Sequence, residues 1–256
     1  MSLEGKAAIV TGSATGIGQG VALALAKAGA RVMVTYNRDP ADETMQLIKD
    51  AGGEAALVKV DVRSRDSIRN LCSETYKTFG KIDILVNNAA AQPNKLLFDY
   101  TEEEFDLVMG VNIKGYWRCI QEVLPYMKQV RFGKIINVAS IHAKRPTGFD
   151  AIYGTSKGGI KMLTREASLA LGRYGITVNI LSPGSTYVAL RATKATISKL
   201  TTAQDFELLN APENGYLSGR VGYPFDMGYS VVFLADEKSQ YINGSILRVD
   251  GGGMMV

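Results

Sequence analysis

Short apolar runs without strict alternation recur along the chain, separated by polar or glycine-containing segments. Such runs are typical of strands that are buried on both faces, as in a parallel sheet. Seven strands are therefore predicted, at residues 6–11, 31–35, 55–60, 82–87, 134–139, 176–181 and 245–249.

Stretches with helical periodicity fill the intervals between these runs. The first helix is predicted from about residue 18 to residue 28, and Gly29 is a natural residue to follow its end. Asp39 before Pro40 predicts an N-cap followed by proline at the first helical position of the second helix. Thr101 opens a later helix with a capping box.

Strands and helices alternate with short connections, which predicts a single-domain α/β, Rossmann-type fold. We expect a doubly wound, seven-stranded parallel sheet with helices on both faces. Ligands in such sheets bind outside the carboxyl ends of the strands. The stretch from about Thr186 to Gly222 is long for a connection. It is predicted to be a substrate lid, the alternative being local irregular packing.

Composition narrows the class of protein. Hydrophobic residues make up 46% and charged residues 21% of the 256, as in an ordinary globular protein. The formal charge is +4, but the basic residues are spread out, so neither a nucleic-acid nor a membrane partner is expected. Cys72 and Cys119 form no disulfide or zinc pattern and are expected to be buried or idle thiols. Because the first residues lack leader features, a cytoplasmic protein is expected.

A glycine-rich loop, TGSATGIG at residues 11–18, lies between the first predicted strand and helix. Glycines let a backbone approach a diphosphate closely, and the free N–H groups of a helix start attract its charge. The spacing is Gly-x-x-x-Gly-x-Gly, and a plain turn is the alternative interpretation. Because the loop lies in the first βαβ unit, we predict dinucleotide contacts from Gly12, Ser13, Thr15, Gly16, Ile17 and Gly18.

The end of the second strand bears on the choice between NAD and NADP. An acidic residue there binds the ribose 2′-hydroxyl, whereas a basic one accepts the 2′-phosphate. The strand ends Tyr36, Asn37, Arg38, Asp39. Arg38 can make a bidentate, charge-assisted contact with a phosphate. NADP is therefore the predicted preference, with NAD as an alternative; otherwise Arg38 is merely solvated and Asp39 only caps the next helix.

Three polar residues suggest the chemistry. Ser140 ends the fifth strand, and Tyr153 and Lys157 lie four positions apart on the next helical stretch, so the last two share a helix face. A nearby cation lowers the pKa of a phenol, which would make Tyr153 a plausible proton donor or acceptor. Ser140 could hydrogen-bond a substrate oxygen. A surface Tyr-Lys pair is the alternative.

Together these motifs resemble the short-chain dehydrogenase/reductase family along essentially the whole chain. The matching signatures are TGSATGIG at 11–18, Asp61, NNAA at 87–90, Asn112, Ser140, YGTSK at 153–157 and Pro183-Gly184. The family usually has NNAG, so Ala90 departs from its pattern, and a small shift of that loop is expected.

The resemblance implies a role for each matching residue. Tyr153 would be the general acid or base, Ser140 would orient the carbonyl, and Lys157 would hold the nicotinamide ribose. Asn112 would anchor a water in a proton relay. Asp61 and Val62 would contact adenine, and the groove would also be formed by Tyr36, Asn37, Arg38, Asn88, Ala89, Ala90, Pro183, Gly184, Ser185 and Thr186.

Three further residues, His142, Tyr116 and Trp117, each have more than one expected role. His142, the single histidine, is expected either in the substrate pocket, with Ser140 and Tyr153, or in a solvated loop. No metal site is expected, because one histidine without a ligand cluster does not bind zinc. Tyr116 and Trp117 are predicted to be core or subunit-contact residues.

The substrate is predicted from resemblance only. A hydride transfer between NAD(P)(H) and a secondary alcohol or ketone is expected. A sugar or polyol dehydrogenase is the first hypothesis, because the chain resembles glucose dehydrogenase and gluconate oxidoreductase members. The alternatives are a 3-oxoacyl-[acyl-carrier-protein] reductase, in which Arg131 and Arg173 would either face the acidic carrier or be plain surface charges, and a non-catalytic NADP sensor. The family also implies a homotetramer. Its contacts are expected from the fourth helix, which Thr101 opens and which contains Trp117, from the fifth helix, which contains Tyr153, and from the C-terminal strand.

Overall fold

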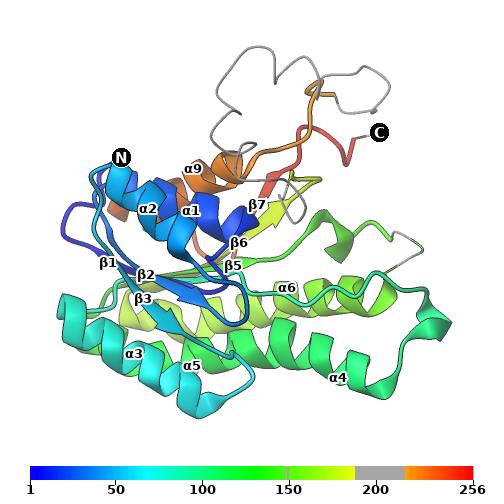
Figure 1. Ribbon diagram of the computed structural model, residues 1–256, viewed down its shortest axis with the longest axis horizontal. Helices are drawn as coiled ribbons and strands as arrows, with labels where there is room; N and C mark the ends of the chain where they lie inside the picture. The colour runs from blue at the N-terminus through cyan, green and yellow to red at the C-terminus, as the bar shows by residue number, and fades with distance from the viewer. Residues whose placement is uncertain (147, 149, 188–216, 256) are drawn as a thin grey trace.

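The structure is a computed structural model that describes residues 1–146, 148, 150–187 and 217–255. Seven strands form one parallel sheet in the order β3-β2-β1-β4-β5-β6-β7 (Figure 1). All seven predicted strands are present, which confirms the predicted fold class. Their bounds are β1 Ala7–Val10, β2 Arg31–Tyr36, β3 Ala55–Lys59, β4 Ile84–Asn87, β5 Gly133–Val138, β6 Ile176–Pro183 and β7 Ile246–Val249.

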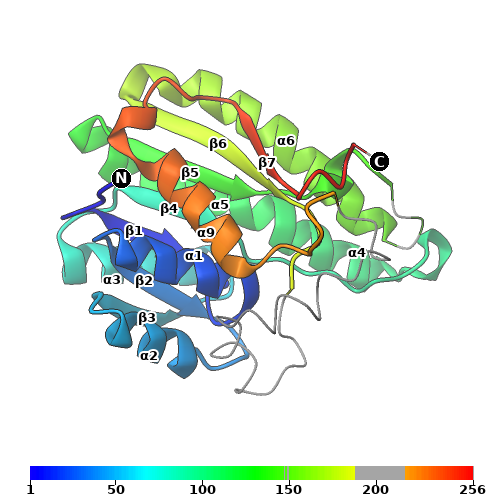
Figure 2. The ribbon, with the colours of Figure 1, turned by 90° about the horizontal axis from the view of Figure 1, so that it is seen from above.

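Helices cover both faces of the sheet, as Figures 1 and 2 show. On one face lie α1 (Gly16–Lys27), α2 (Asp42–Asp50) and α9 (Pro224–Ala235). On the other lie α3 (Arg65–Phe79), α4 (Glu102–Met109), α5 (Tyr116–Val130) and α6 (Ala151–Leu171). Because both faces are covered, the central strands need apolar side chains at every position, which explains their unalternating runs.

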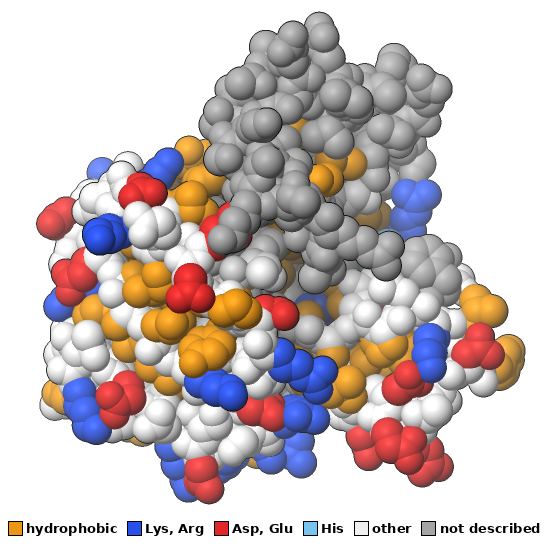
Figure 3. Space-filling model, in the orientation of Figure 1, with side chains coloured by type: hydrophobic (Ala, Val, Ile, Leu, Met, Phe, Trp, Pro, Cys, Tyr) orange, Lys and Arg blue, Asp and Glu red, His pale blue; other side chains and the backbone are white. Residues whose placement is uncertain are grey.

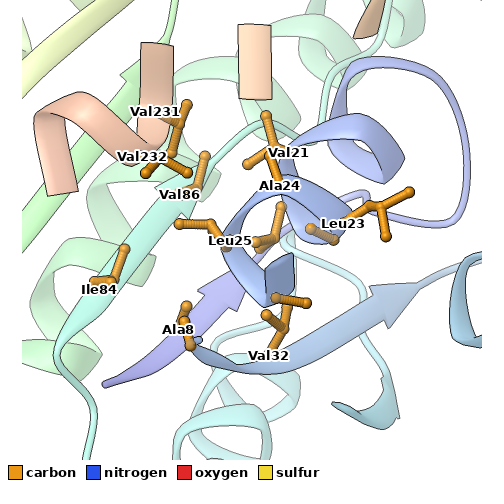
Figure 4. Close-up of a cluster of buried hydrophobic side chains, with 14 of the residues drawn as sticks. Ala8, Val21, Leu23, Ala24, Leu25, Val32, Ile84, Val86, Val231 and Val232 are labelled. Carbon is orange, nitrogen blue, oxygen red and sulfur yellow. The ribbon is translucent and has the colours of Figure 1, made fainter. Parts of the chain in front are cut away.

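Each face has its own hydrophobic layer. Between the sheet and α1 and α9, residues such as Val21, Leu25 and Val231 pack against strand residues such as Val32 and Ile84 (Figure 4). The other layer joins α3 and α5 to the opposite side of the same strands. The two layers hold the carboxyl ends of the strands at one edge, where the candidate site lies.

The close crossing of α1 and α9 depends on two glycines. A Cβ atom on Gly20 would lie 2.4 Å from Cβ of Pro224, and one on Gly228 would lie 2.6 Å from Cβ of Ala24. Real Cβ atoms do not approach so closely. The sequence therefore needs glycine at both positions to bring the two helices together.

Most predicted helix ends are confirmed, but one is wrong. Thr101 and Glu104 form the predicted capping box of α4. However, α2 begins at Asp42 and its N-cap is Ala41, with no side-chain capping bond. Asp39 and Pro40 remain in the connection after β2, because Ala41, which is buried in the core, takes the N-cap position.

The predicted lid lies mostly outside the described residues, which leave out 188–216, so it stays a prediction. Its two ends meet: the Tyr187 N–H donates to the Gly222 carbonyl at 2.8 Å, and the Gly222 N–H donates to the Ser185 carbonyl at 2.9 Å.

Cys72 and Cys119 are free and buried, as predicted. No helix in the described ranges has the length and hydropathy needed to span a membrane.

Candidate active site

A cavity of about 650 Å³ lies along the carboxyl ends of the strands. This is where open α/β sheets bind ligands, and the volume suits a cofactor or small molecule. Most of the residues predicted from the sequence line it, namely Gly12, Thr15, Gly16, Ile17, Tyr36, Asn37, Arg38, Asp61, Val62, Asn88, Ala89, Ala90, Ser140, His142, Tyr153, Lys157, Pro183, Gly184, Ser185 and Thr186.

The glycine-rich loop has the form that a diphosphate needs. Gly12 has φ = +64°, and a Cβ atom there would lie 2.9 Å from Cα of Ala89. Thr35 on β2 holds the loop, because its Oγ1 accepts the Gly12 N–H at 2.9 Å. Thr15 is the N-cap of α1 but its side chain makes no capping bond, so the first N–H groups of the helix lack a side-chain partner. The backbone here fits an anion.

Two of the predicted loop contacts support the loop from behind and do not line the cavity. The Ser13 side chain is fully buried: its Oγ donates to the Val10 carbonyl and accepts the Thr35 N–H, each at 2.8 Å. A Cβ atom on Gly18 would lie 2.2 Å from the Gly12 carbonyl oxygen. Only backbone groups of these two residues are therefore placed to reach a cofactor.

A second arginine, which the sequence analysis did not select, lines the cavity near Arg38. Arg63 makes a bidentate pair with Asp61, with Nη2 at 2.7 Å from Oδ2 and Nε at 3.1 Å from Oδ1. The hydrogen bond from Arg63 lowers the pKa of Asp61, and the charge of Arg38 acts in the same direction. Asp39 lines the cavity as well. This end therefore combines two guanidinium groups with two carboxylates.

Ser140, Tyr153 and Lys157 meet at the other end of the cavity. Ser140 follows β5 by two residues, and Tyr153 and Lys157 lie one turn apart on α6. Tyr153 is hydrogen-bonded to Ser140. The Lys157 Nζ lies 5.3 Å from the centre of the Tyr153 ring and donates to the Val138 carbonyl at 2.9 Å. The structure thus brings together three side chains that the sequence places up to 17 positions apart.

Burial controls the ionisation of this cluster. It raises the pKa of Tyr153 to about 12, although the hydrogen bond with Ser140 acts in the opposite direction. It also lowers the pKa of Lys157 to about 7. Desolvation of the phenolate is the largest cause of the raised pKa of Tyr153, and the expected lowering of that pKa by Lys157 stays a prediction. A protonated phenol suits donation to a carbonyl oxygen.

Asn112 lies beside the cavity, in the π-helical turn Gly110–Gly115 between α4 and α5. Its Oδ1 accepts the Ala91 N–H at 2.8 Å, and its Nδ2 donates to the Ala91 carbonyl and to Ser156 Oγ. Both amide N–H groups are used, so Asn112 ties the loop after β4 to α6. Its part in a proton relay stays a prediction.

His142 and Ala90 also line the cavity. The His142 N–H donates to Ser140 Oγ at 3.1 Å, which fixes the serine beside Tyr153. Ala90 does not need a glycine conformation, since the non-glycine residues described with positive φ are Asn94 and Arg131. Among the residues that the structure describes, no group of three or more His, Cys, Asp or Glu side chains could hold a metal ion.

Comparison with known proteins agrees with this geometry. A family profile described as enoyl-(acyl carrier protein) reductase matches residues 12–253, which is most of the chain. The chain belongs to the short-chain dehydrogenase/reductase family. It is 35% identical over 252 residues to the 3-oxoacyl-[acyl-carrier-protein] reductase FabG of Staphylococcus epidermidis, covering 98% of this chain and 99% of that protein. It is 33% identical to glucose 1-dehydrogenase 2 of Bacillus subtilis, covering 98% and 95%.

Solved structures of the family superpose on the whole chain. A protein of Sinorhizobium meliloti, provisionally named a short-chain alcohol dehydrogenase, has a TM-score of 0.87 at 31% identity, covering 99% of this chain and 98% of that one. An Agrobacterium tumefaciens protein, provisionally named a 2-deoxy-D-gluconate 3-dehydrogenase and solved with bound NADP, has a TM-score of 0.81 at 30% identity, covering 100% and 98%. This chain is therefore an oxidoreductase of a family that uses NAD(P).

Among the residues of this short-chain dehydrogenase/reductase site that the sequence did not indicate, Thr35 and Arg63 make the contacts described above. Thr35 lies inside a buried strand, and only the fold shows that its hydroxyl holds the glycine loop. Arg63 follows Asp61 by two positions, a spacing that could have suggested the pair, because a carboxylate at the end of a strand needs a partner when it is partly buried.

Proposed function

We propose that this enzyme transfers a hydride between NADP(H) and a secondary alcohol or ketone of a sugar or polyol. The observation that carries the proposal is the meeting of Ser140, Tyr153 and Lys157 at one end of a cavity whose other end holds the glycine loop and Arg38. The cavity has the residues for a dinucleotide along its length. A nicotinamide bound there supplies or accepts the hydride.

Side chains of this protein transfer the proton of the reaction. In the reducing direction, the Tyr153 hydroxyl donates a proton to the carbonyl oxygen as the hydride arrives at carbon, and Ser140 holds that oxygen through a hydrogen bond. The high pKa of Tyr153, about 12, keeps the phenol protonated at neutral pH. We expect the Lys157 side chain to donate to ribose hydroxyls of the cofactor, because it lines the cavity beside Tyr153.

Arg38 supports NADP as the preferred cofactor. It lines the cavity after β2, and Arg63 pairs with Asp61 next to it, so the Arg38 guanidinium is left to bind a 2′-phosphate. We expect Arg38→Ala to raise the Kd for NADPH about tenfold or more and to change the Kd for NADH little, because a charge-assisted hydrogen bond contributes about 1.5–3 kcal/mol. Fluorescence titration with both cofactors measures this.

The control for that titration is Arg69→Ala on α3, whose side chain is 59% exposed and lies outside the cavity lining. It should leave both affinities at the wild-type value. Equal weakening of NADPH and NADH binding by Arg38→Ala would show that the arginine does not act on the 2′-phosphate.

A sugar or polyol substrate is supported by the names of two relatives, glucose 1-dehydrogenase 2 and a 2-deoxy-D-gluconate 3-dehydrogenase. The test is to assay the purified enzyme with a panel of sugars, polyols, steroids and acetoacetyl thioesters. Turnover of each substrate is measured from the absorbance of NADPH. A kcat/KM for a sugar or polyol that exceeds the value for every thioester supports the proposal. The reverse order assigns the enzyme to the alternative below.

The second candidate is a 3-oxoacyl-[acyl-carrier-protein] reductase, favoured by the 35% identity to FabG. Arg131 and Arg173 lie together, with Arg131 Nη2 donating to the Arg173 carbonyl at 3.0 Å. They precede β5 and β6, so they lie at the amino ends of the strands, opposite the cavity of their own chain. An acidic carrier held by these arginines could serve only the cavity of another copy. On the face seen in Figure 3, basic and acidic side chains are mixed.

We also propose a homotetramer. Apolar side chains are exposed along α5 and α6, where Trp117 is 40%, Met162 56% and Leu169 80% exposed, and Ile246 on the edge strand β7 is 40% exposed. Tyr116, by contrast, is buried in the core. Contacts through α5, α6 and β7 would cover these residues. Light scattering that shows a stable monomer at micromolar concentration would contradict the proposal.

A further inference from the structure

A buried hydroxyl on α2 contacts the back of the glycine-rich loop. The Thr44 side chain is fully buried, and its Oγ1 lies 3.0 Å from the carbonyl oxygens of both Ser13 and Ala14. Its one proton is therefore shared between two carbonyls of the loop. Gln19 on α1 is buried as well, and its Nε2 donates to Thr44 Oγ1 at 3.1 Å and to the Ala14 carbonyl at 3.5 Å. Two buried polar side chains from different helices thus converge on two adjacent peptide groups.

This contact fixes the direction of two backbone N–H groups. The described part of the chain has no cis peptide bond, and in a trans peptide the carbonyl and the following N–H point in opposite directions. Because the Ser13 and Ala14 carbonyls point towards Thr44, the N–H groups of Ala14 and Thr15 point away from it. Ala14 and Thr15 line the cavity, whereas Thr44 is absent from its described lining. Neither N–H has an acceptor among the residues that the structure describes, so both are free to bind a ligand.

The two N–H groups lie at the end of the cavity that contains Arg38. Thr35 on β2 holds the start of the loop, since its carbonyl accepts the Ser13 N–H at 3.1 Å, and Thr44 on α2 holds the residues that follow. The connection from β2 to α2, which includes Arg38, therefore joins the two elements that hold the loop, and α2 lies beside α1 in Figures 1 and 2. Free N–H groups beside a guanidinium favour an anion, and the anionic groups of a nicotinamide dinucleotide are its phosphates.

We propose that Thr44, supported by Gln19, is a positioning residue that aims the Ala14 and Thr15 N–H groups at a phosphate of the cofactor. This rests on the proposed function, in which the cavity holds NADP(H). Thr44 acts only through the loop. A packing role would need the volume of the side chain, which valine nearly supplies, whereas the proposed role needs the hydroxyl. The phosphate is either the diphosphate, which NADPH and NADH share, or the 2′-phosphate, which only NADPH has.

The test is the Kd for NADPH and for NADH in Thr44→Val, measured by fluorescence titration. Valine leaves the two loop carbonyls without the hydroxyl proton, so the N–H groups behind them should lose their fixed direction. The Kd for NADPH should rise about 5–10-fold, which is the scale of one hydrogen bond, and Thr44→Ser should restore the wild-type value. In kinetics the change should fall on the KM for the cofactor, because Ser140 and Tyr153 lie at the other end of the cavity. A Kd for NADH that rises by the same factor assigns the N–H groups to the diphosphate, and an unchanged one assigns them to the 2′-phosphate.

Thr75→Val on α3 is the matched control. Thr75 is also a fully buried helical threonine, but its hydroxyl donates to the Leu71 carbonyl of its own helix at 2.7 Å and lies outside the described cavity lining. Both Kd values should stay at the wild-type level in this variant, which shows that loss of a buried hydroxyl does not by itself weaken cofactor binding.

Two results would overturn the proposal: Kd values in Thr44→Val within twofold of the wild type, or a Thr44→Ser variant that binds as weakly as Thr44→Val. If circular dichroism shows that Thr44→Val does not fold, Gln19→Met removes the amide that holds the Thr44 hydroxyl and is judged by the same rise in Kd. A wild-type protein that binds neither cofactor refutes the proposed function itself. Wild-type binding that Thr44→Val leaves unchanged refutes only the role of Thr44.

Discussion

Replacing Tyr153 by phenylalanine is expected to lower kcat by about 10²-fold or more while leaving the Kd for NADPH nearly unchanged. The change removes one oxygen, which is the proton donor for the carbonyl and the partner of Ser140. General acid or base groups contribute about 10²–10⁴ in rate, which sets the expected scale. The phenylalanine ring should take the place of the tyrosine ring in the cavity lining, so the shape of the cofactor groove should not change. Steady-state kinetics and fluorescence titration give the two quantities.

Tyr241→Phe is the matched control, because its side chain is fully exposed and lies away from the cavity. It should retain wild-type turnover and cofactor affinity. A Tyr153→Phe enzyme that also keeps most of its turnover would remove Tyr153 from the mechanism. A wild-type protein that binds NADPH but turns over no substrate would instead support the non-catalytic sensor, which needs no proton donor.

The sheet was predictable because its central strands are buried on both faces. Such strands leave a mark in the sequence, an apolar run without alternation, and all seven runs correspond to strands. The start of α2 was not predictable in the same way. Asp39 and Pro40 have the residue types of a helix start, but the helix begins at Asp42, because burial of Ala41 in the core, which local preference does not reveal, fixes the N-cap position.

The candidate site was predictable as far as its residues belong to local motifs. The glycine loop and the Tyr153-x-x-x-Lys157 pair are each formed by one short stretch of chain, so their spacing already indicates their geometry. The contribution of Thr35 depends on parallel pairing between β1 and β2, and that of Asn112 on Ser156, which is 44 positions away. Such long-range partners follow from the packing of elements. The lowered pKa of Lys157 likewise follows from burial, which spacing does not reveal.

Lys157→Met is expected to raise the Kd for NADPH by about 10–100-fold and to lower kcat by a similar factor. Hydrogen bonds from a charged group contribute about 1.5–3 kcal/mol, and the same ammonium is proposed to serve both the ribose and the cluster around Tyr153. Methionine fills nearly the same volume. The Val138 carbonyl keeps a donor, because the Tyr116 hydroxyl also reaches it, at 3.2 Å. Titration and kinetics measure both effects, with Lys161→Met, one turn further along α6, as the control.

The same variant should nevertheless fold more stably at neutral or lower pH. The pKa of Lys157 is lowered to about 7, from an ordinary value of 10.5, because the charged form is buried. Below pH 7 the lysine is protonated in both folded and unfolded chains, so the full cost of burying its charge, a few kcal/mol on the order of 1.4 per pKa unit, opposes folding. Above pH 7 the lysine of the folded chain is mostly deprotonated. The free-energy cost of its burial then falls as the pH rises, and it disappears near pH 10.5, where the unfolded chain loses the proton as well. The gain in Tm for Lys157→Met should therefore be largest at pH 6–7 and vanish towards pH 10. A variant with lower Tm than the wild type at pH 6 would show that the ammonium stabilises the fold. The buried lysine would then not lower the stability of the enzyme in exchange for activity.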